Sequence, residues 1–145
     1  MQNKNKFLIT CILLSIAVGI NSYVIPYFSS SEKNLENISS EIALNSDDLV
    51  NSFIKNEEKS NILFAGKIIE VDGFVKEVSF LNKRNTVILY TKNKKYGIIC
   101  DLHSSQTEKI KLLKPNQKIR VKGICKGFLK DVVLLNCYIE LNSNE

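Results

Sequence analysis

The sequence predicts an all-β fold in which five strands close into a barrel with flanking helices. Two observations support it. From Ala65 onward, apolar and polar side chains alternate with a period of two, as in half-buried strands. These stretches follow the order three strands, a short helix and two strands, which is the order of an OB fold. A generic small antiparallel sheet is the competing architecture.

The chain has 145 residues, enough for one domain and an appendage. We expect an amino-terminal membrane anchor over residues 1–28, a flexible stalk over 29–45, an OB-fold domain over 46–141 and a short tail over 142–145. Without Lys4 and Lys6, 18 basic residues face 15 acidic ones, a net charge of only +3. So small an excess is no strong signal for nucleic acid.

The amino-terminal segment is apolar and long enough to cross a membrane. Residues 7–20 carry no charge, and apolar residues resume at 23–28. As one helix, residues 7–28 would span about 33 Å, the thickness of a hydrocarbon core. Tyr23, Tyr27 and Phe28 suit a membrane interface and favour an uncleaved anchor. Cleavage near Ser22 and lipoprotein processing at Cys11 are the alternatives.

The charges flanking this segment predict its orientation. Lys4 and Lys6 precede it, whereas the residues beyond it are mainly acidic. By the positive-inside rule, the amino terminus stays in the cytoplasm and the domain faces the periplasm from the inner membrane. If the leader is cleaved, the domain is secreted to the periplasm.

The exported part begins with a stalk and a helix. Residues 29–45 are rich in Ser, Asn and Glu and lack periodicity, which predicts a flexible stalk. Ser46 is then a candidate N-cap for a helix over about 47–60, with Asp47 and Asp48 in its first turn.

The barrel elements follow. Strands are expected over 67–78, 86–91, 95–102, 118–126 and 132–141, and a short helix from Ser104 or Ser105 to Leu113. Gly73 would let the long first strand bend or bulge.

Two stretches resemble a known family. They are LVNSFIKNEEKSNILFAGKIIEVDGFVKEV over 49–78 and LKPNQKIRVKGICKGFLKDVVLLNCYI over 113–139, and both resemble the tRNA_anti-like family. The matching positions are Asn56, Glu57, Gly66, Gly73, Gly123, Gly127 and Asp131. The resemblance implies an OB fold and membership among largely exported or anchored bacterial proteins without an assigned activity. The family name records a likeness to anticodon-binding domains, and an exported protein does not meet cytoplasmic tRNA.

The cysteines of the barrel share the parity of its inward-facing residues. Cys100, Cys125 and Cys137 are therefore expected to be buried. In an oxidising compartment, Cys125 and Cys137 could pair across the last hairpin, or Cys100 could pair with Cys137. Together with His103 they supply zinc-ligand types, but their spacing matches no common zinc motif, so no metal site is predicted.

Basic residues gather late in the chain. Eight Lys or Arg and no acid lie between Lys109 and Lys130. Four of them alternate onto the outer face of one strand and form a candidate polyanion stripe: Lys118, Arg120, Lys122 and Lys126. The alternative is internal pairing of Arg120 and Lys122 with Glu70 and Asp72 on the adjacent first strand.

A second candidate site follows from where OB domains usually bind ligands. Aromatic and basic residues could line a groove across the second and third strands and the first and last loops: Phe80, Lys83, Arg84, Tyr90, Phe128 and Lys130. This mixture suits stacking on bases or sugars. Alternatively, Phe128 closes the end of the barrel.

No catalytic motif is recognisable. The chain has one histidine, and it lacks the G-x-S-x-G, H-E-x-x-H and phosphate-loop patterns, so neither an enzyme nor a cofactor is predicted. The sequence favours a binding module attached to the inner membrane through residues 7–28, with a protein or an envelope polymer as its ligand. The alternative is single-stranded nucleic acid at the cell envelope.

Overall fold

The computed structural model describes residues 15, 35–81 and 84–140. The chain divides into two compact units, Met1–Lys33 and Asn34–Glu145. Except for residue 15, the predicted anchor helix over 7–28 lies outside the described residues, as does the tail over 142–145. Within the described ranges, no helix is long and apolar enough to span a membrane.

Six strands form one sheet: β1 (Ile42–Asn45), β2 (Ile68–Leu81), β3 (Arg84–Leu89), β4 (Ile98–Leu102), β5 (Lys118–Phe128) and β6 (Val132–Glu140). Five of them close a barrel in the order β2-β3-β4-β6-β5, because β5 pairs back onto β2. Only β4 and β6 pair in parallel within this ring. The predicted five-stranded OB barrel is confirmed.

The long strand β2 serves both halves of the barrel. Its first half pairs with β5 and its second half with β3, and the register shifts between Val75 and Glu77. The irregularity therefore lies just after Gly73, where a bend was predicted. A Cβ at Gly73 would lie 3.1 Å from Leu89 Cδ1, so this glycine permits close packing of β2 on β3.

The flexible stalk predicted up to residue 45 is wrong for its last part. Residues Ile42–Asn45 form β1, which runs parallel to β2 with Ile42 beside Ile69. Side-chain burial alternates along β1, and Leu35 is fully buried. Four residues were too few for their alternation to stand out in a polar segment.

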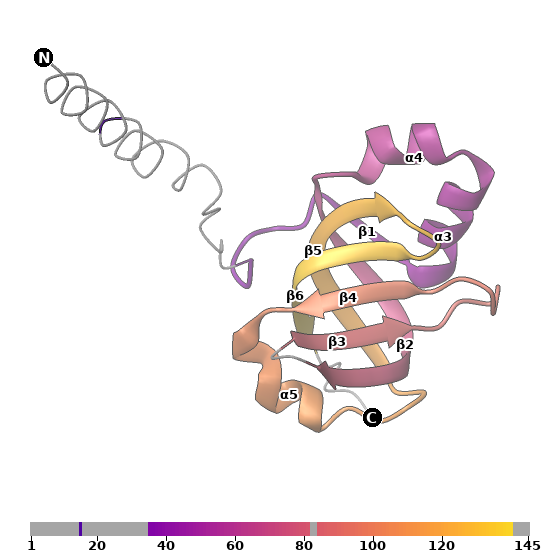
Figure 1. Cartoon of the computed structure of the whole chain (residues 1–145). Coiled ribbons are helices and arrows are strands. Elements are labelled where there is room, and N and C mark those ends of the chain that lie inside the picture. Colours follow the sequence, from indigo (N-terminus) through magenta and orange to yellow (C-terminus); the bar gives the residue numbers. More distant parts are fainter. Residues whose placement is uncertain (1–14, 16–34, 82–83, 141–145) are drawn as a thin grey trace, which may run out of the picture. The chain divides into compact units, whose positions relative to one another are not determined.

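The predicted helix over 47–60 is two helices, α3 (Ser46–Lys55) and α4 (Glu57–Phe64). The break lies at Asn56, which is extended (φ −159°) and caps α4 through its side chain. The N-cap of α3 is Asn45, not Ser46: its Oδ1 accepts a hydrogen bond from Asp48 N at 2.9 Å. Figure 1 shows α3 and α4 at one end of the barrel.

The opposite end is covered by the segment between β4 and β5 (Figure 1). It consists of a 3-10 turn, η2 (Ser104–Gln106), and a short helix, α5 (Thr107–Lys111). Ile110 of α5 is buried in the core. The helix expected between the third and fourth barrel strands is therefore present.

Aromatic side chains close the barrel end beneath α3 and α4. The ring of Phe128 stacks on Phe53 with centroids 5.8 Å apart and lies 5.5 Å from Tyr96, while Phe53 also contacts Phe64 at 5.9 Å. Phe128 therefore belongs to the end of the barrel, as the alternative reading held, and not to a ligand groove.

Candidate binding pocket

The six residues predicted to line a ligand groove do not form one site. Tyr90 and Arg84 stand at opposite ends of β3, about 20 Å apart at the rise of a strand. Phe80 is half exposed opposite Asn85. The guanidinium of Arg84 lies 3.6 Å from Asp101. Phe128 packs inside the barrel end, Lys130 is exposed in the β5–β6 turn, and Lys83 lies outside the described residues.

Two members of the predicted polyanion stripe are held in internal ion pairs. Arg120 donates two hydrogen bonds to the Asp72 carboxylate, at 2.8 and 2.9 Å. Lys122 is buried, and its Nζ lies 3.6 Å from both Glu70 and Glu140. The register pairs Glu70 with Lys122 and Asp72 with Arg120, so the predicted cross-strand charge pairs are confirmed.

The Asp72–Arg120 pair shifts the pKa values of both its members. The hydrogen bonds from Arg120 lower the pKa of Asp72, although partial burial opposes the shift. The same hydrogen bonds raise the pKa of Arg120. Both groups are therefore charged at neutral pH and compensate each other.

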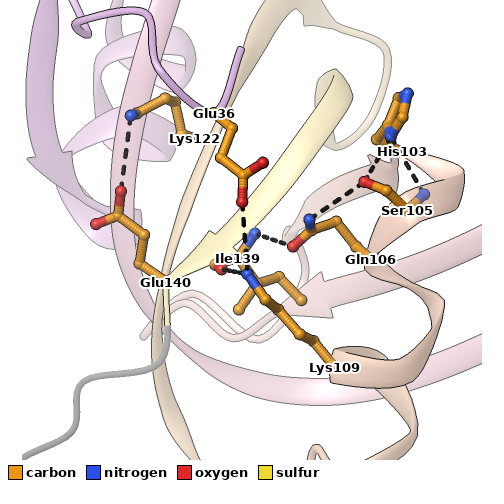
Figure 2. A network of polar contacts seen from close by, with 8 residues as sticks. All are labelled: Glu36, His103, Ser105, Gln106, Lys109, Lys122, Ile139 and Glu140. Atoms are coloured by element: carbon orange, nitrogen blue, oxygen red, sulfur yellow. Dashed lines mark hydrogen bonds and ion pairs between the residues drawn. The ribbon is translucent and has the colours of Figure 1, made fainter. Parts of the chain in front are cut away.

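A polar network engages further basic groups on the neighbouring surface (Figure 2). Lys109 Nζ lies 4.0 Å from Glu36 and 3.5 Å from the carbonyl oxygen of Ile139. Gln106 Oε1 accepts a hydrogen bond from Ile139 N at 3.1 Å. This network ties η2 and α5 to β6, which is a structural role.

Lys118 and Lys126 are exposed, and neither forms an ion pair within the described part of the chain. The polyanion stripe stays a prediction, with these two lysines as its exposed members. They stand eight positions apart on β5, about 26 Å. Two charges so far apart do not make a continuous basic surface.

The middle of the outer face that OB domains commonly use is apolar here. Ile88 of β3 pairs with Ile99 of β4, and Ile99 pairs with Val133 of β6. All three are half-buried and point away from the core. Within the described residues, Arg84 at the start of β3 is already paired with Asp101, so this face offers phosphate no row of unpaired cations.

A pocket of about 630 Å³ lies where α3 begins, beside β2 and the end of β3. Its aromatic lining comes from Phe74 and Tyr90, which are 51% and 40% exposed. The two residues are neighbours on adjacent strands, because Tyr90 N donates to the carbonyl of Phe74 at 2.8 Å. Lys118 of β5 flanks Phe74 on its other side. We call this the Phe74–Tyr90 pocket.

Hydrogen bonds fix the walls of the Phe74–Tyr90 pocket. Ser46 Oγ donates to the carbonyl of Tyr90 at 2.9 Å, and Asp47 Oδ1 accepts from Lys92 N at 2.6 Å. These bonds join the start of α3 to the end of β3. On the opposite side, Asn116 N donates to the carbonyl of Val75 at 2.7 Å. The pocket is therefore preformed, as ligand sites usually are.

The charges around the pocket nearly balance. Asp47 lies 3.9 Å from Lys92, and Asp72 is paired with Arg120. Lys118 adds one exposed positive charge. The lining thus combines an aromatic surface with carboxylates whose charge is already compensated.

A smaller hollow of about 170 Å³ adjoins this pocket. It is lined by Lys76, Lys94 and Tyr96, and it shares Tyr90 and Thr91 with the larger pocket. Thr91 Oγ1 hydrogen bonds to the carbonyl oxygen of Tyr96 at 2.6 Å, which fixes the loop between them. The Tyr90 side chain therefore stands between two hollows.

Sequence reasoning found Tyr90 but missed its neighbour Phe74. Phe74 lies on the same face of β2 as Asp72 and Lys76, because side chains alternate along a strand. The alternation in the sequence therefore already indicated an aromatic ring on the outer face of β2. Asp47 was interpreted as a helix-dipole residue, and its contact with Lys92 depends on the fold.

The disulfide predicted between Cys125 and Cys137 is not formed. Cys100, Cys125 and Cys137 are buried free thiols. In the β5–β6 register Cys125 faces Leu134, three residues before Cys137. That offset is about 10 Å along the strand, beyond the reach of a disulfide.

Cys137 instead lies beside Cys100, its alternative partner. Burial raises the pKa of Cys137 well above the usual thiol value, and the neighbouring Cys100 thiol adds to the shift. His103 stacks on Tyr138 with ring centroids 5.1 Å apart. Within the described residues, no group of three or more His, Cys, Asp or Glu side chains is arranged to hold a metal ion.

Comparison with a solved structure supports the fold. A candidate nucleic acid-binding lipoprotein from Klebsiella pneumoniae superposes with a TM-score of 0.56 at 14% identity, covering 67% of this chain and 90% of its own. The S. pombe Stn1–Ten1 complex gives a TM-score of 0.45 at 12% identity, covering 53% of this chain and 59% of that chain. At such identities the likeness concerns fold alone.

Among curated proteins, none matches this chain in sequence. The tRNA_anti-like family model, in contrast, matches residues 1–139, nearly the whole length. The barrel order, the helix between β4 and β5 and this match agree with the resemblance seen in the sequence. The chain belongs to the tRNA_anti-like family.

Proposed function

We propose that this protein is a noncatalytic OB-fold binding module, tethered to the inner membrane by residues 7–28 and facing the periplasm, whose ligand is a protein or polymer of the cell envelope. The Phe74–Tyr90 pocket carries the proposal. Its volume of about 630 Å³ falls in the range of ligand sites, and it holds two half-exposed aromatic side chains beside compensated charges. Aromatic residues uncovered in a preformed hollow favour contact with a ligand.

Charge pairing weighs against a polyanion as the ligand. Arg120 and Lys122 are neutralised by Asp72, Glu70 and Glu140, and the middle of the outer face of β3 and β4 is apolar. Binding to phosphates depends on cations that release counterions, so the pairing of Arg120 and Lys122 lowers the affinity that this strand offers to a polyanion.

Single-stranded nucleic acid is the second candidate. The fold of the Klebsiella lipoprotein, described as a candidate nucleic acid-binding protein, and the row Lys118–Phe74–Tyr90 favour it. Titration of the full-length chain with oligothymidylate at several salt concentrations separates the two. An affinity that falls steeply with rising salt would support nucleic acid. Absence of binding at low salt would exclude single-stranded nucleic acid as the ligand.

Site-specific photo-crosslinking in cells tests the proposed function. A photoactive residue at position 92 stands on the rim of the pocket, because the Lys92 side chain is 91% exposed. The matched control carries it at Leu129, which is 83% exposed in the β5–β6 turn. We expect envelope components to crosslink at position 92 and not at 129. Equal crosslinking at both positions, or none at 92, would contradict the proposal.

A further inference from the structure

The neighbouring rings of Phe74 and Tyr90 form a surface for stacking. Both side chains point outward from adjacent strands, and the described part of the chain leaves them 51% and 40% exposed. Flat apolar partners for such rings include the C–H face of a sugar ring and a nucleobase. The polar groups around the rings decide between these partners.

Two carboxylates stand at the edge of this surface. Asp47 and Asp72 both line the pocket, and each has its own cation, Lys92 and Arg120. A carboxylate in an ion pair still has lone pairs that accept hydrogen bonds from hydroxyl groups. A phosphodiester has no proton to donate to these acceptors, whereas a hydroxyl group does.

The second hollow extends the surface in one direction. Tyr90 and Thr91 belong to both hollows, so a ligand can pass over Tyr90 from the larger pocket into the smaller one. Tyr96 supplies another aromatic ring in the smaller hollow. A linear polymer with repeating units fits this arrangement better than a single compact molecule.

We infer that the Phe74–Tyr90 pocket is a glycan-binding site, in which a linear oligosaccharide stacks on Phe74 and Tyr90, donates hydroxyl hydrogen bonds to Asp47 and Asp72, and continues over Tyr90 into the adjoining hollow. This inference rests on the proposed function and names the class of its ligand. The inference concerns binding of the oligosaccharide alone and includes no covalent step.

The inference is tested by titrating the full-length chain, purified in a zwitterionic detergent without sugar headgroups, against two probes. These are a linear tetrasaccharide (chitotetraose) and oligothymidylate, which has hydroxyl groups only at its ends. We expect chitotetraose to bind with a Kd below about 1 mM and oligothymidylate to bind at least about tenfold more weakly. Tighter binding of oligothymidylate, or no binding of chitotetraose, would overturn the inference.

Variants assign the binding to the pocket. Tyr90→Ala should weaken chitotetraose binding about tenfold or more, since Tyr90 serves both hollows, whereas Tyr90→Phe keeps the ring and should retain most of the affinity. Leu129→Ala is the matched control, because it removes an exposed apolar side chain elsewhere. Unchanged binding by a folded Tyr90→Ala protein would overturn the inference.

The outcome separates the inference from the proposed function. If position 92 crosslinks to an envelope protein while chitotetraose does not bind, the glycan is excluded and the binding module stands. If neither crosslinking nor binding occurs, both fail.

Discussion

Single residues in this barrel show how its charges are used. Lys122 is 7% exposed, and its ammonium group is paired with the carboxylates of Glu70 and Glu140. Its charge is therefore neutralised within the protein. Replacing it with alanine would leave Glu70 partly buried without its cation, which costs about 3 kcal/mol. A basic residue on the outer face of a strand is thus no guide to ligand charge until its neighbours are known.

The Asp72–Arg120 pair gives stability a defined pH dependence. Because Arg120 lowers the pKa of Asp72, the pair stabilises the fold above the ordinary carboxyl pKa, and this contribution is lost as pH falls through the lowered value. Asp72→Asn should reduce the free energy of unfolding by about 1 kcal/mol at pH 7, and by progressively less as the pH falls. Urea unfolding across this pH range measures the difference.

The control for Asp72→Asn is Glu108→Gln. Glu108 is paired with Lys111 at 2.8 Å, but its side chain is 83% exposed, so its loss should change stability very little. Equal losses from the two substitutions would contradict the account of the Asp72–Arg120 pair.

The buried thiols should be unreactive in the folded protein. Burial raises the pKa of Cys125 and Cys137, so little thiolate is present at pH 8. In a Cys11→Ser background, we expect iodoacetamide to label them slowly before unfolding and rapidly after it. As pH rises through the ordinary thiol pKa, the unfolded chain ionises first, so stability should fall. Fast labelling of the native protein would show that these thiols are exposed.

At the scale of elements, the two helices before β2 each depend on an asparagine cap. The Asn56 side chain accepts a hydrogen bond from Lys59 N at 2.9 Å and starts α4 immediately after α3 ends. The sequence pattern suggested one helix because apolar residues continue past this point. The extended backbone of Asn56 separates the helices, and periodicity is insensitive to a break of one residue.

Removal of the Asn56 cap tests this interpretation of the helix pair. Asn56→Ala should destabilise the protein by about 1 kcal/mol, since it leaves an amide at the start of α4 without its acceptor. Asn56→Ser, which keeps a capping oxygen, should retain most of the stability. Thermal unfolding compares the variants. A Ser variant as unstable as the Ala variant would argue for a role other than capping.

The residues that carry the family resemblance are mostly structural. Gly66 adopts φ +81° after α4, and a Cβ at Gly123 would lie 2.5 Å from Cys137 Sγ. Asp131 Oδ1 accepts a hydrogen bond from Gly97 N at 2.6 Å, which ties the β5–β6 turn to the start of β4. These positions specify how the barrel closes, which explains why the resemblance predicted the fold well and the ligand poorly.

At the scale of the whole molecule, the sequence predicted the features that depend on local patterns. It missed the features that form only when distant segments come together. The five barrel strands and the pairs Glu70–Lys122 and Asp72–Arg120 follow from alternation and strand order. The short β1 was missed because it gains its stability from pairing with β2. The pocket is lined by residues from four separate segments, 45–47, 72–74, 90–92 and 116–118, so no local sequence pattern predicts it.

The most direct test of the Phe74–Tyr90 pocket is an amide chemical-shift map of the full-length chain in micelles, recorded while solubilised cell-envelope fragments are added. We expect the largest shifts at Phe74, Tyr90 and Lys118. Shifts centred instead on Ile88 and Ile99, the outer face that OB domains commonly use, would contradict this account.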